Sequence, residues 1–122
     1  MGKTNRQRGV VNAALRPEKG DFIAVAFDPQ SGHEQKGGRP ALVVSNTQFN
    51  VHTGLAIVCP LTNKDRKFPF HVAIPNDPEV TGFVMVEQVK SIDYRARKTR
   101  LIGNVSEGVL EEVLSILDAC IY

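Results

Sequence analysis

The hydrophobic pattern of this chain changes its period once, and this change constrains the fold more than any other feature. Up to residue 105, apolar residues come in short runs that glycine, proline and polar residues separate, as in consecutive β-strands. From Ser106 onward they recur with the spacing of an amphipathic helix, at Val109, Leu110, Val113, Leu114, Leu117 and Ile121. Many short strands followed by one helix predict a mainly β domain of the α+β class, a small β-barrel that a C-terminal helix covers.

Strands are expected where an apolar run lies between turn residues. We predict them at 21–27, 41–45, 55–61, 68–74, 82–86, 88–92 and 99–105. The stretch 82–92 is one long bent strand or two. Residues 46–53 fit a short helical turn that Gly54 closes. Residues 28–39 have no periodicity and three glycines, so we predict a long loop of the kind that often carries function.

Length and composition indicate a single folded domain. The chain has 122 residues, of which 42% are apolar and 23% charged, and this excludes a disordered chain. No apolar run approaches the roughly 20 residues of a membrane helix. No apolar segment of a signal peptide follows the basic N-terminus, so we expect a cytoplasmic protein. Residues 1–19 are polar, basic and non-periodic and predict a flexible basic N-terminal extension, with the domain at 20–122.

The net charge of +2 hides an asymmetry between these two parts. Residues 1–19 carry five basic and one acidic side chain, whereas residues 20–122 carry ten basic and twelve acidic ones. The overall charge is therefore no argument for nucleic-acid binding, which would need a local basic patch. Cys59 and Cys120 lie in apolar segments, and we expect both to be buried, reduced thiols. No Cys or His spacing indicates a metal site, and no cofactor is expected.

Three motifs in a fixed order carry a resemblance to a known family. They are residues 28–40 (DPQSGHEQKGGRP), residues 59–62 (CPLT) and residues 87–97 (EQVKSIDYRAR). The first is similar to the D-P, G-[HS]-E-Q and G-x-R-P loop of the MazF/PemK-like toxins. The second resembles the P-[LIV]-T strand end of that family, and the third its acidic-Gln-[VP]-[KR]-[ST]-[ILM] strand with a following arginine. The resemblance runs from about residue 20 to the end of the chain.

The resemblance implies an SH3-like barrel and a homodimer. It also implies a toxin of a type II toxin–antitoxin system that cleaves single-stranded RNA, mRNA in particular, at specific sequences without a metal or other cofactor. A cognate antitoxin would silence it with a disordered tail that wraps the toxin dimer and folds on binding.

Metal-independent RNA cleavage uses the ribose 2′-OH as an internal nucleophile. The hydroxyl attacks the adjacent phosphate and leaves a 2′,3′-cyclic phosphate and a 5′-OH. The enzyme must accept the proton of the 2′-OH, stabilise charge at phosphorus and protonate the leaving oxygen. DNA has no 2′-OH and is therefore not a substrate.

Arg39 and Thr62 are the first catalytic candidates. The resemblance places Arg39 beside the reacting phosphate, where a guanidinium offers a planar fork of donors that matches phosphate oxygens. Thr62 ends the second motif, and its hydroxyl suits a hydrogen bond to a phosphate oxygen or to the attacking group. Outside these motifs each would be an ordinary residue at a strand end.

His33, Glu34 and Glu87 are further candidates for proton transfer. His33 suits a proton shuttle near neutral pH, and the alternative is a solvated loop histidine. Glu34 either transfers a proton or orders the loop by pairing with a basic residue. Some relatives place an arginine and an aspartate two residues apart where this chain has Met85 and Glu87. That pairing is not carried over, and Glu87 is either a base or a structural anion at a dimer contact.

RNA binding is expected from polar and basic side chains in or beside the motifs, namely Gln35, Lys36, Asn63, Lys64, Gln88, Lys90 and Arg95. Other basic residues suit contacts to an RNA backbone, namely Arg66, Lys67, Arg97, Lys98 and Arg100. The alternative for all of them is a solvated charged surface. His52 and His71 have no partner in the sequence pattern, and we assign them no role.

Two other functions compete with RNA cleavage. One is a toxin of the same barrel that poisons a gyrase-like enzyme by binding. The other is a decayed member that keeps the fold and the antitoxin interface. A binding toxin has no need of Arg39 and Thr62 together, and loss of either would indicate decay. Both residues are present, which favours the nuclease, although the fold alone decides nothing.

Overall fold

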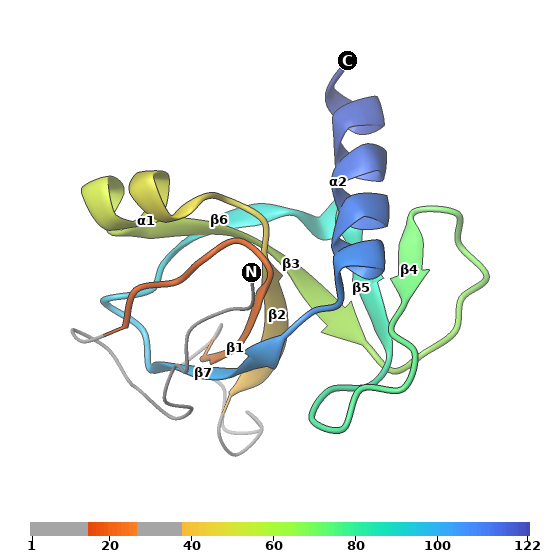
Figure 1. Ribbon diagram of the computed structural model, residues 1–122, viewed down its shortest axis with the longest axis horizontal. Coiled ribbons are helices and arrows are strands. Elements are labelled where there is room, and N and C mark those ends of the chain that lie inside the picture. The colour runs from red at the N-terminus through yellow and green to blue at the C-terminus, as the bar shows by residue number, and fades with distance from the viewer. Residues whose placement is uncertain (1–14, 27–37) are drawn as a thin grey trace.

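The computed structural model describes residues 15–26 and 38–122. Within them, seven strands, two α-helices and one 3-10 turn follow one another (Figure 1). In chain order they are β1 (Asp21–Val25), β2 (Arg39–Val43), α1 (Thr47–Thr53), β3 (Leu55–Thr62), β4 (His71–Ala73), β5 (Phe83–Met85), η2 (Val86–Gln88), β6 (Lys90–Asp93), β7 (Thr99–Asn104) and α2 (Glu107–Ile121).

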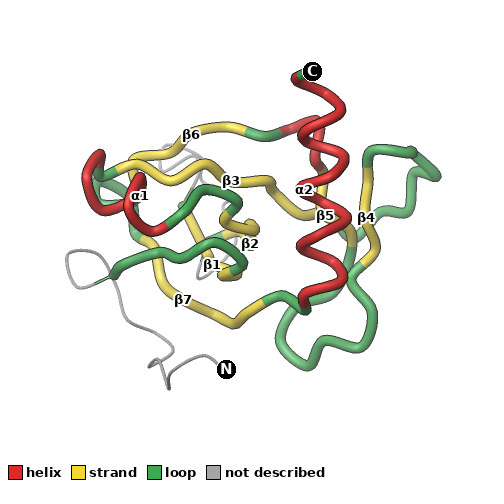
Figure 2. Tube along the Cα trace, turned by 45° about the horizontal axis from the view of Figure 1, so that its top comes forward, coloured by secondary structure: helices red, strands yellow, loops and turns green. Residues whose placement is uncertain are grey.

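The strands form one antiparallel sheet in the order β4-β5-β3-β2-β1-β7. The sheet forks at β3, where residues 55–58 pair with β6 and residues 61–62 pair with β5. In Figure 2, α1 and α2 lie at opposite ends of β6. The predicted mainly β fold with a C-terminal helix is confirmed. The described strands leave the sheet open rather than closed into a barrel, because no ladder among them joins β7 to β4 or β6.

Both faces of this sheet are buried, which explains why its central strands are apolar along most of their length. Alternate residues of a strand point to opposite faces, so Phe22 and Ile23 of β1 enter different cores. The helix-side core comprises Phe22, Leu42, Val44, Cys59, Val72, Val80, Val84, Val86, Val105, Val109 and Val113. The opposite core comprises Leu15, Ile23, Val25, Ala41, Val43, Ala56, Val58, Ile92, Tyr94 and Leu101.

The packed part of the chain begins before the first strand. Leu15 is buried in the opposite core, and the carbonyl of the buried Pro17 accepts a hydrogen bond from the Asn50 amide at 2.9 Å. The predicted flexible extension covers residues 1–19. Residues 1–14 lie outside the described residues, whereas the segment from Leu15 to Pro17 packs against the domain because Leu15 supplies an apolar side chain to its core.

The helices begin where capping residues stand. The Asn46 side chain accepts a hydrogen bond from the Phe49 N–H, and Gly54 ends α1 with φ 74°. The Ser106 hydroxyl accepts a hydrogen bond from the Val109 N–H at the start of α2. α2 has 15 residues, and no helix in the described ranges combines the length and the apolar character that crossing a membrane requires.

The structure changes two of the sequence-based expectations and decides between the alternatives of a third. The predicted strand 68–74 is only three residues long, because Pro69 has no N–H to donate and Phe68 and Phe70 are exposed. The stretch 82–92 is two strands that η2 separates. Cys59 is buried, as predicted, but Cys120 is exposed, so the prediction of a second buried thiol is wrong. Cys120 lies in the last turn of α2, which extends past the sheet (Figure 1).

Candidate active site

The ends of five strands meet at one side of the sheet. Val25, the last residue of β1, pairs with Arg39 at the start of β2 and with Thr99 at the start of β7. Thr62, the last residue of β3, pairs with Phe83 at the start of β5. Loops leave the sheet at such ends, and loops that a rigid scaffold positions are the usual carriers of binding and catalytic residues.

The register of β2 on β3 brings Arg39 next to Thr62. Ala41 pairs with Pro60, and the same register carried two residues further sets Arg39 opposite Thr62. Directly opposed residues of antiparallel strands lie close together on one face. Both residues line one pocket, which we call the Arg39 pocket. Its lining comprises Arg39, Pro40, Leu61, Thr62, Asn63 and Thr81. The two residues that the motifs single out therefore share one pocket.

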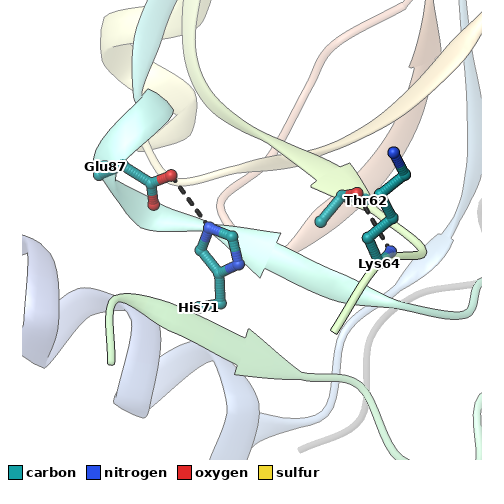
Figure 3. Close-up of polar contacts among 4 residues, drawn as sticks. All are labelled: Thr62, Lys64, His71 and Glu87. Atoms are coloured by element: carbon teal, nitrogen blue, oxygen red, sulfur yellow. Dashed lines mark hydrogen bonds and ion pairs between the residues drawn. The ribbon is translucent and has the colours of Figure 1, made fainter. Parts of the chain in front are cut away.

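The pocket offers one cation and one hydroxyl. Arg39 is exposed, and its guanidinium forms no hydrogen bond or ion pair within residues 15–26 and 38–122. The Thr62 hydroxyl oxygen accepts a hydrogen bond from the Lys64 N–H at 3.2 Å (Figure 3). A hydroxyl has one proton to donate besides its lone pairs, so Thr62 keeps its donor available. An anionic oxygen, such as that of a phosphate, is an acceptor that suits either group.

Two glycines allow the chain to close around this pocket. Gly38 has φ 85°, and a Cβ there would lie 2.8 Å from the Val25 backbone. Gly82 has φ 112°, and a Cβ there would lie 2.3 Å from the carbonyl oxygen of Thr62. Conformation and space both exclude a side chain at these two positions. The glycine that precedes Arg39 in the first motif is thus required by the path of the backbone.

Thr81 is a pocket residue that the sequence reasoning missed. It precedes Gly82 in the loop between β4 and β5, and its hydroxyl donates to Asn63 Oδ1 at 3.2 Å. This bond holds Asn63, a predicted RNA contact, at the pocket wall. The only local signal was the Thr-Gly pair, because the approach of this loop to β3 depends on the pairing of β5 with β3.

Glu87 contacts His71 (Figure 3). It is not among the residues that line the Arg39 pocket. A carboxylate can only accept, so His71 Nε2 carries the proton of the 2.9 Å hydrogen bond to Glu87. The His71 side chain is 4% exposed, and its Nδ1 is buried without a hydrogen-bond partner. The Phe68 ring packs edge-on against the imidazole, 5.2 Å between centroids. We call His71, Glu87 and Phe68 the histidine corner.

Cys59 lies on β3 in the helix-side core. Burial, and after it the negative charge of Glu87, raises the pKa of the Cys59 thiol from 9.0 to about 12. The thiolate is the reactive form of cysteine, so this residue is not a nucleophile at neutral pH.

Three predicted RNA contacts lie away from the Arg39 pocket, and none of them lines it. Gln88 ends η2, and Lys90 begins β6. Arg95 donates from Nη2 to the Val51 carbonyl in α1 at 3.1 Å, and its guanidinium lies 5.6 Å from the centroid of the Tyr94 ring. Arg95 is therefore already engaged at the end of α1.

The predicted loop residues His33, Glu34, Gln35 and Lys36 lie outside the described residues. The chain enters β2 from this loop through Gly38, directly before Arg39. In the part of the chain that the structure describes, no group of three or more His, Cys, Asp or Glu side chains is placed to hold a metal ion.

Comparisons with known proteins place the chain in a family. Residues 18–121 match the family described as PemK-like, MazF-like toxin of type II toxin–antitoxin system. The chain is 43% identical over 109 residues to the endoribonuclease toxin ChpB of Escherichia coli strain K12, which covers 85% of this chain and 93% of ChpB. The matched region contains all of the Arg39 pocket and the histidine corner.

Solved structures share the fold. The crystal structure of MazF from Deinococcus radiodurans matches with a TM-score of 0.77 at 36% identity, over 88% of this chain and 97% of that chain. The MazE–MazF crystal structure from the same organism matches with a TM-score of 0.77 at 31% identity, over 88% and 96%. Family model, sequence identity and fold agree, and the chain belongs to the PemK-like, MazF-like toxin family of type II toxin–antitoxin systems.

Proposed function

We propose that this chain is the toxin of a type II toxin–antitoxin system, a sequence-specific endoribonuclease that cleaves single-stranded RNA, mRNA in particular. The observation that carries the proposal is the pocket in which Arg39, without a described partner, lies beside the Thr62 hydroxyl. The relative ChpB is named an endoribonuclease toxin, which supports the same activity here.

In the proposed reaction the 2′-oxygen forms a bond to phosphorus and the bond from phosphorus to the 5′-oxygen breaks. The products are a 2′,3′-cyclic phosphate and a 5′-OH, and no metal takes part. Arg39 stabilises the charge that develops on the phosphate oxygens. A guanidinium carries only hydrogen-bond donors and no lone pair that could accept a proton, so we assign Arg39 this electrostatic role alone. The Thr62 hydroxyl donates a hydrogen bond to a phosphate oxygen.

Two proton transfers complete the reaction, one from the 2′-OH and one to the leaving 5′-oxygen. We assign them to His33 and Glu34, which precede Arg39 in the first motif of the sequence. Glu87 is the other sequence candidate for a base. Its bond to the enclosed His71 and its position outside the pocket lining support the role of a structural anion instead.

We assign the predicted RNA contacts according to whether each residue lines the pocket or lies elsewhere. Asn63 lines it and Lys64 follows, so we assign these two to the nucleotides at the cut. Gln35 and Lys36 belong to the loop before Arg39 and are assigned to the same nucleotides. Gln88, Lys90 and Arg95 lie on η2, on β6 and in the turn after β6, and would meet more distant parts of an RNA chain.

The proposed partners are a cognate antitoxin and a second copy of the chain in a homodimer. The MazF of D. radiodurans has been solved together with MazE, which supports a protein partner for this toxin. We expect the antitoxin to bind through a disordered segment that folds on binding. The proposed location is the cytoplasm, where mRNA is available.

The test is to incubate the purified chain with a long single-stranded RNA in EDTA and to map the ends by sequencing. We expect discrete cuts with 2′,3′-cyclic phosphate and 5′-OH ends. An RNA with a 2′-deoxy nucleotide at the mapped cut site should stay intact, and so should RNA incubated with Arg39→Ala. Intact RNA with the unmodified chain would reject the nuclease and favour the gyrase-binding toxin or the decayed member.

A further inference from the structure

The Arg39 pocket continues along the sheet into a second hollow. The two share Pro40, Asn63 and Thr81, and the second extends to Ala24 and Arg100. We propose that Arg100 in this second hollow binds the backbone phosphate of a nucleotide that neighbours the cut in the same RNA strand. The inference rests on the proposed nuclease activity and adds a subsite to it.

Strand register sets the position of Arg100. Ala24 of β1 pairs with Pro40 of β2 on one side and with Arg100 of β7 on the other. Directly opposed residues of antiparallel strands project to the same face, so these three form a row across the sheet. Neighbouring strands lie about 4.8 Å apart, which sets the backbone of Arg100 about 10 Å from β2, the strand that carries Arg39.

The row has a charge at its far end and none between. Arg100 is exposed and forms no hydrogen bond or ion pair with any other described residue. Ala24 and Pro40 are short and apolar. Arg39, next to Pro40, belongs to the alternate face of β2, so the two arginines are linked around the strand end by the residues that both hollows share. Asn63 stands at the border of the two hollows, and its amide nitrogen is free to donate while its Oδ1 accepts from Thr81.

An RNA strand fits this arrangement better than a free anion does. Glu79 also lines the second hollow and is engaged in another interaction, so its carboxylate opposes any anion that binds there alone. A strand already held at Arg39 brings its next phosphates to Arg100 without a second association step. Extended nucleic-acid backbones are tracked in this way by basic side chains along a groove.

The test measures binding of an RNA that carries a 2′-deoxy nucleotide at the mapped cut site, which stays intact while Arg39 is kept. Arg100→Gln is compared with Lys19→Gln, which removes an exposed positive charge just before β1, at the end of that strand opposite the pocket. We expect Arg100→Gln to weaken binding roughly tenfold and to lower the slope of log K against log salt by about 0.7, the value of one phosphate contact on a single strand. Lys19→Gln should change neither. Equal affinity and slope in the two variants would overturn the subsite.

Cleavage of unmodified RNA by the chain with Arg39 intact provides a second measurement. Arg100→Gln should raise KM and leave kcat within about twofold, because a contact to a remote phosphate is made equally in ground and transition states. The difference should vanish on an RNA trimmed to the nucleotides at the cut, and a loss that persists there would overturn the subsite. If the unmodified chain cleaves no RNA, the nuclease proposal fails, and the binding series, run on the uncleaved RNA, still decides on Arg100.

Discussion

The Arg39 pocket and the histidine corner lie on neighbouring strands, but their charged side chains differ in whether they have a partner. In the pocket, Arg39 is exposed and has no partner within the described ranges. In the corner, Glu87 accepts a hydrogen bond from His71, whose side chain is 4% exposed. An exposed charge without a partner costs little in water and stays available for a ligand, whereas a carboxylate bonded to an enclosed imidazole is committed to the fold.

This contrast separates residues that act on a substrate from residues that hold the site in place. It predicts that variants in the pocket change the rate of cleavage and leave stability intact. Variants in the corner should do the reverse. A change at Gly82 should affect both rate and stability, because Gly82 lies against Thr62 and also sets the path of the loop that carries Thr81.

The largest effect is expected from Arg39→Ala. Loss of a preorganised donor to a developing oxyanion lowers the rate about 10²–10³-fold. The free energy of unfolding should change by less than about 0.5 kcal/mol, since the side chain is exposed and forms no described contact. Single-turnover cleavage and urea unfolding measure the two quantities. A comparable loss in stability would mean that Arg39 belongs to the scaffold and would remove the contrast.

Gly82→Ala should affect both quantities. An alanine would have to hold φ 112° with its Cβ 2.3 Å from the Thr62 carbonyl, so we expect roughly 2–3 kcal/mol of destabilisation. The strain acts on the residue beside Arg39, so cleavage should also slow. Gly108→Ala is the matched control, because a Cβ there meets nothing within 4 Å and should stabilise α2 by about 0.5–1 kcal/mol. Normal stability and rate in Gly82→Ala would show that the loop between β4 and β5 can retreat from β3.

In the histidine corner, Glu87→Ala leaves the enclosed His71 Nε2–H without an acceptor and should cost roughly 1–2 kcal/mol of unfolding free energy. Glu87→Gln keeps an oxygen that can accept this bond, and its cost should be smaller. Neither variant should lower the rate of cleavage more than about twofold under conditions where the protein stays folded. Glu111→Gln, on the exposed side of α2, controls for the loss of one acidic charge.

A hundredfold loss of activity in Glu87→Gln with normal stability would contradict this prediction. It would return Glu87 to the role of base, which the sequence left open beside that of a structural anion. Rate and stability measured on the same Glu87 variants therefore decide between these two roles.

The contrast also explains what could be read from the sequence. Arg39 and Thr62 were predictable because each lies inside a local motif. The predicted strands at 41–45 and 55–61 stop short of them, whereas in the structure they are the first residue of β2 and the last of β3. The partner of Glu87 was not predictable, because His71 lies 16 residues earlier and meets it only through the pairing of β4 with β5 and the turn at η2. The sequence pattern accordingly left His71 without a role.

The fold shows the same limit. The change from strand to helix period at Ser106 and the end of the first helix at Gly54 were local signals, and the structure confirms both. The fork of the sheet at β3 was not predictable, because it depends on which halves of one apolar strand pair with β5 and β6. Thr81 enters the pocket through that fork and was missed for the same reason.

The smallest expected effect concerns Cys59, which is buried in the helix-side core near Glu87, whereas Cys120 is exposed. Since burial and then Glu87 raise the pKa of Cys59 to about 12, iodoacetamide at pH 8 should modify Cys120 alone in the folded chain. Mass spectrometry of the digested protein measures this directly.

The same raised pKa predicts a pH dependence of stability. The folded state keeps the Cys59 proton that the unfolded state loses above about pH 9, so the contribution of this thiol is fully present below pH 9 and is lost as pH rises toward 12. In Glu87→Gln the second cause of the shift is gone, so the decline should be shallower than in the unmodified chain. An identical decline in both proteins would mean that burial alone sets the thiol pKa. The influence of Glu87 would then end at His71, and the histidine corner would be electrostatically separate from β3.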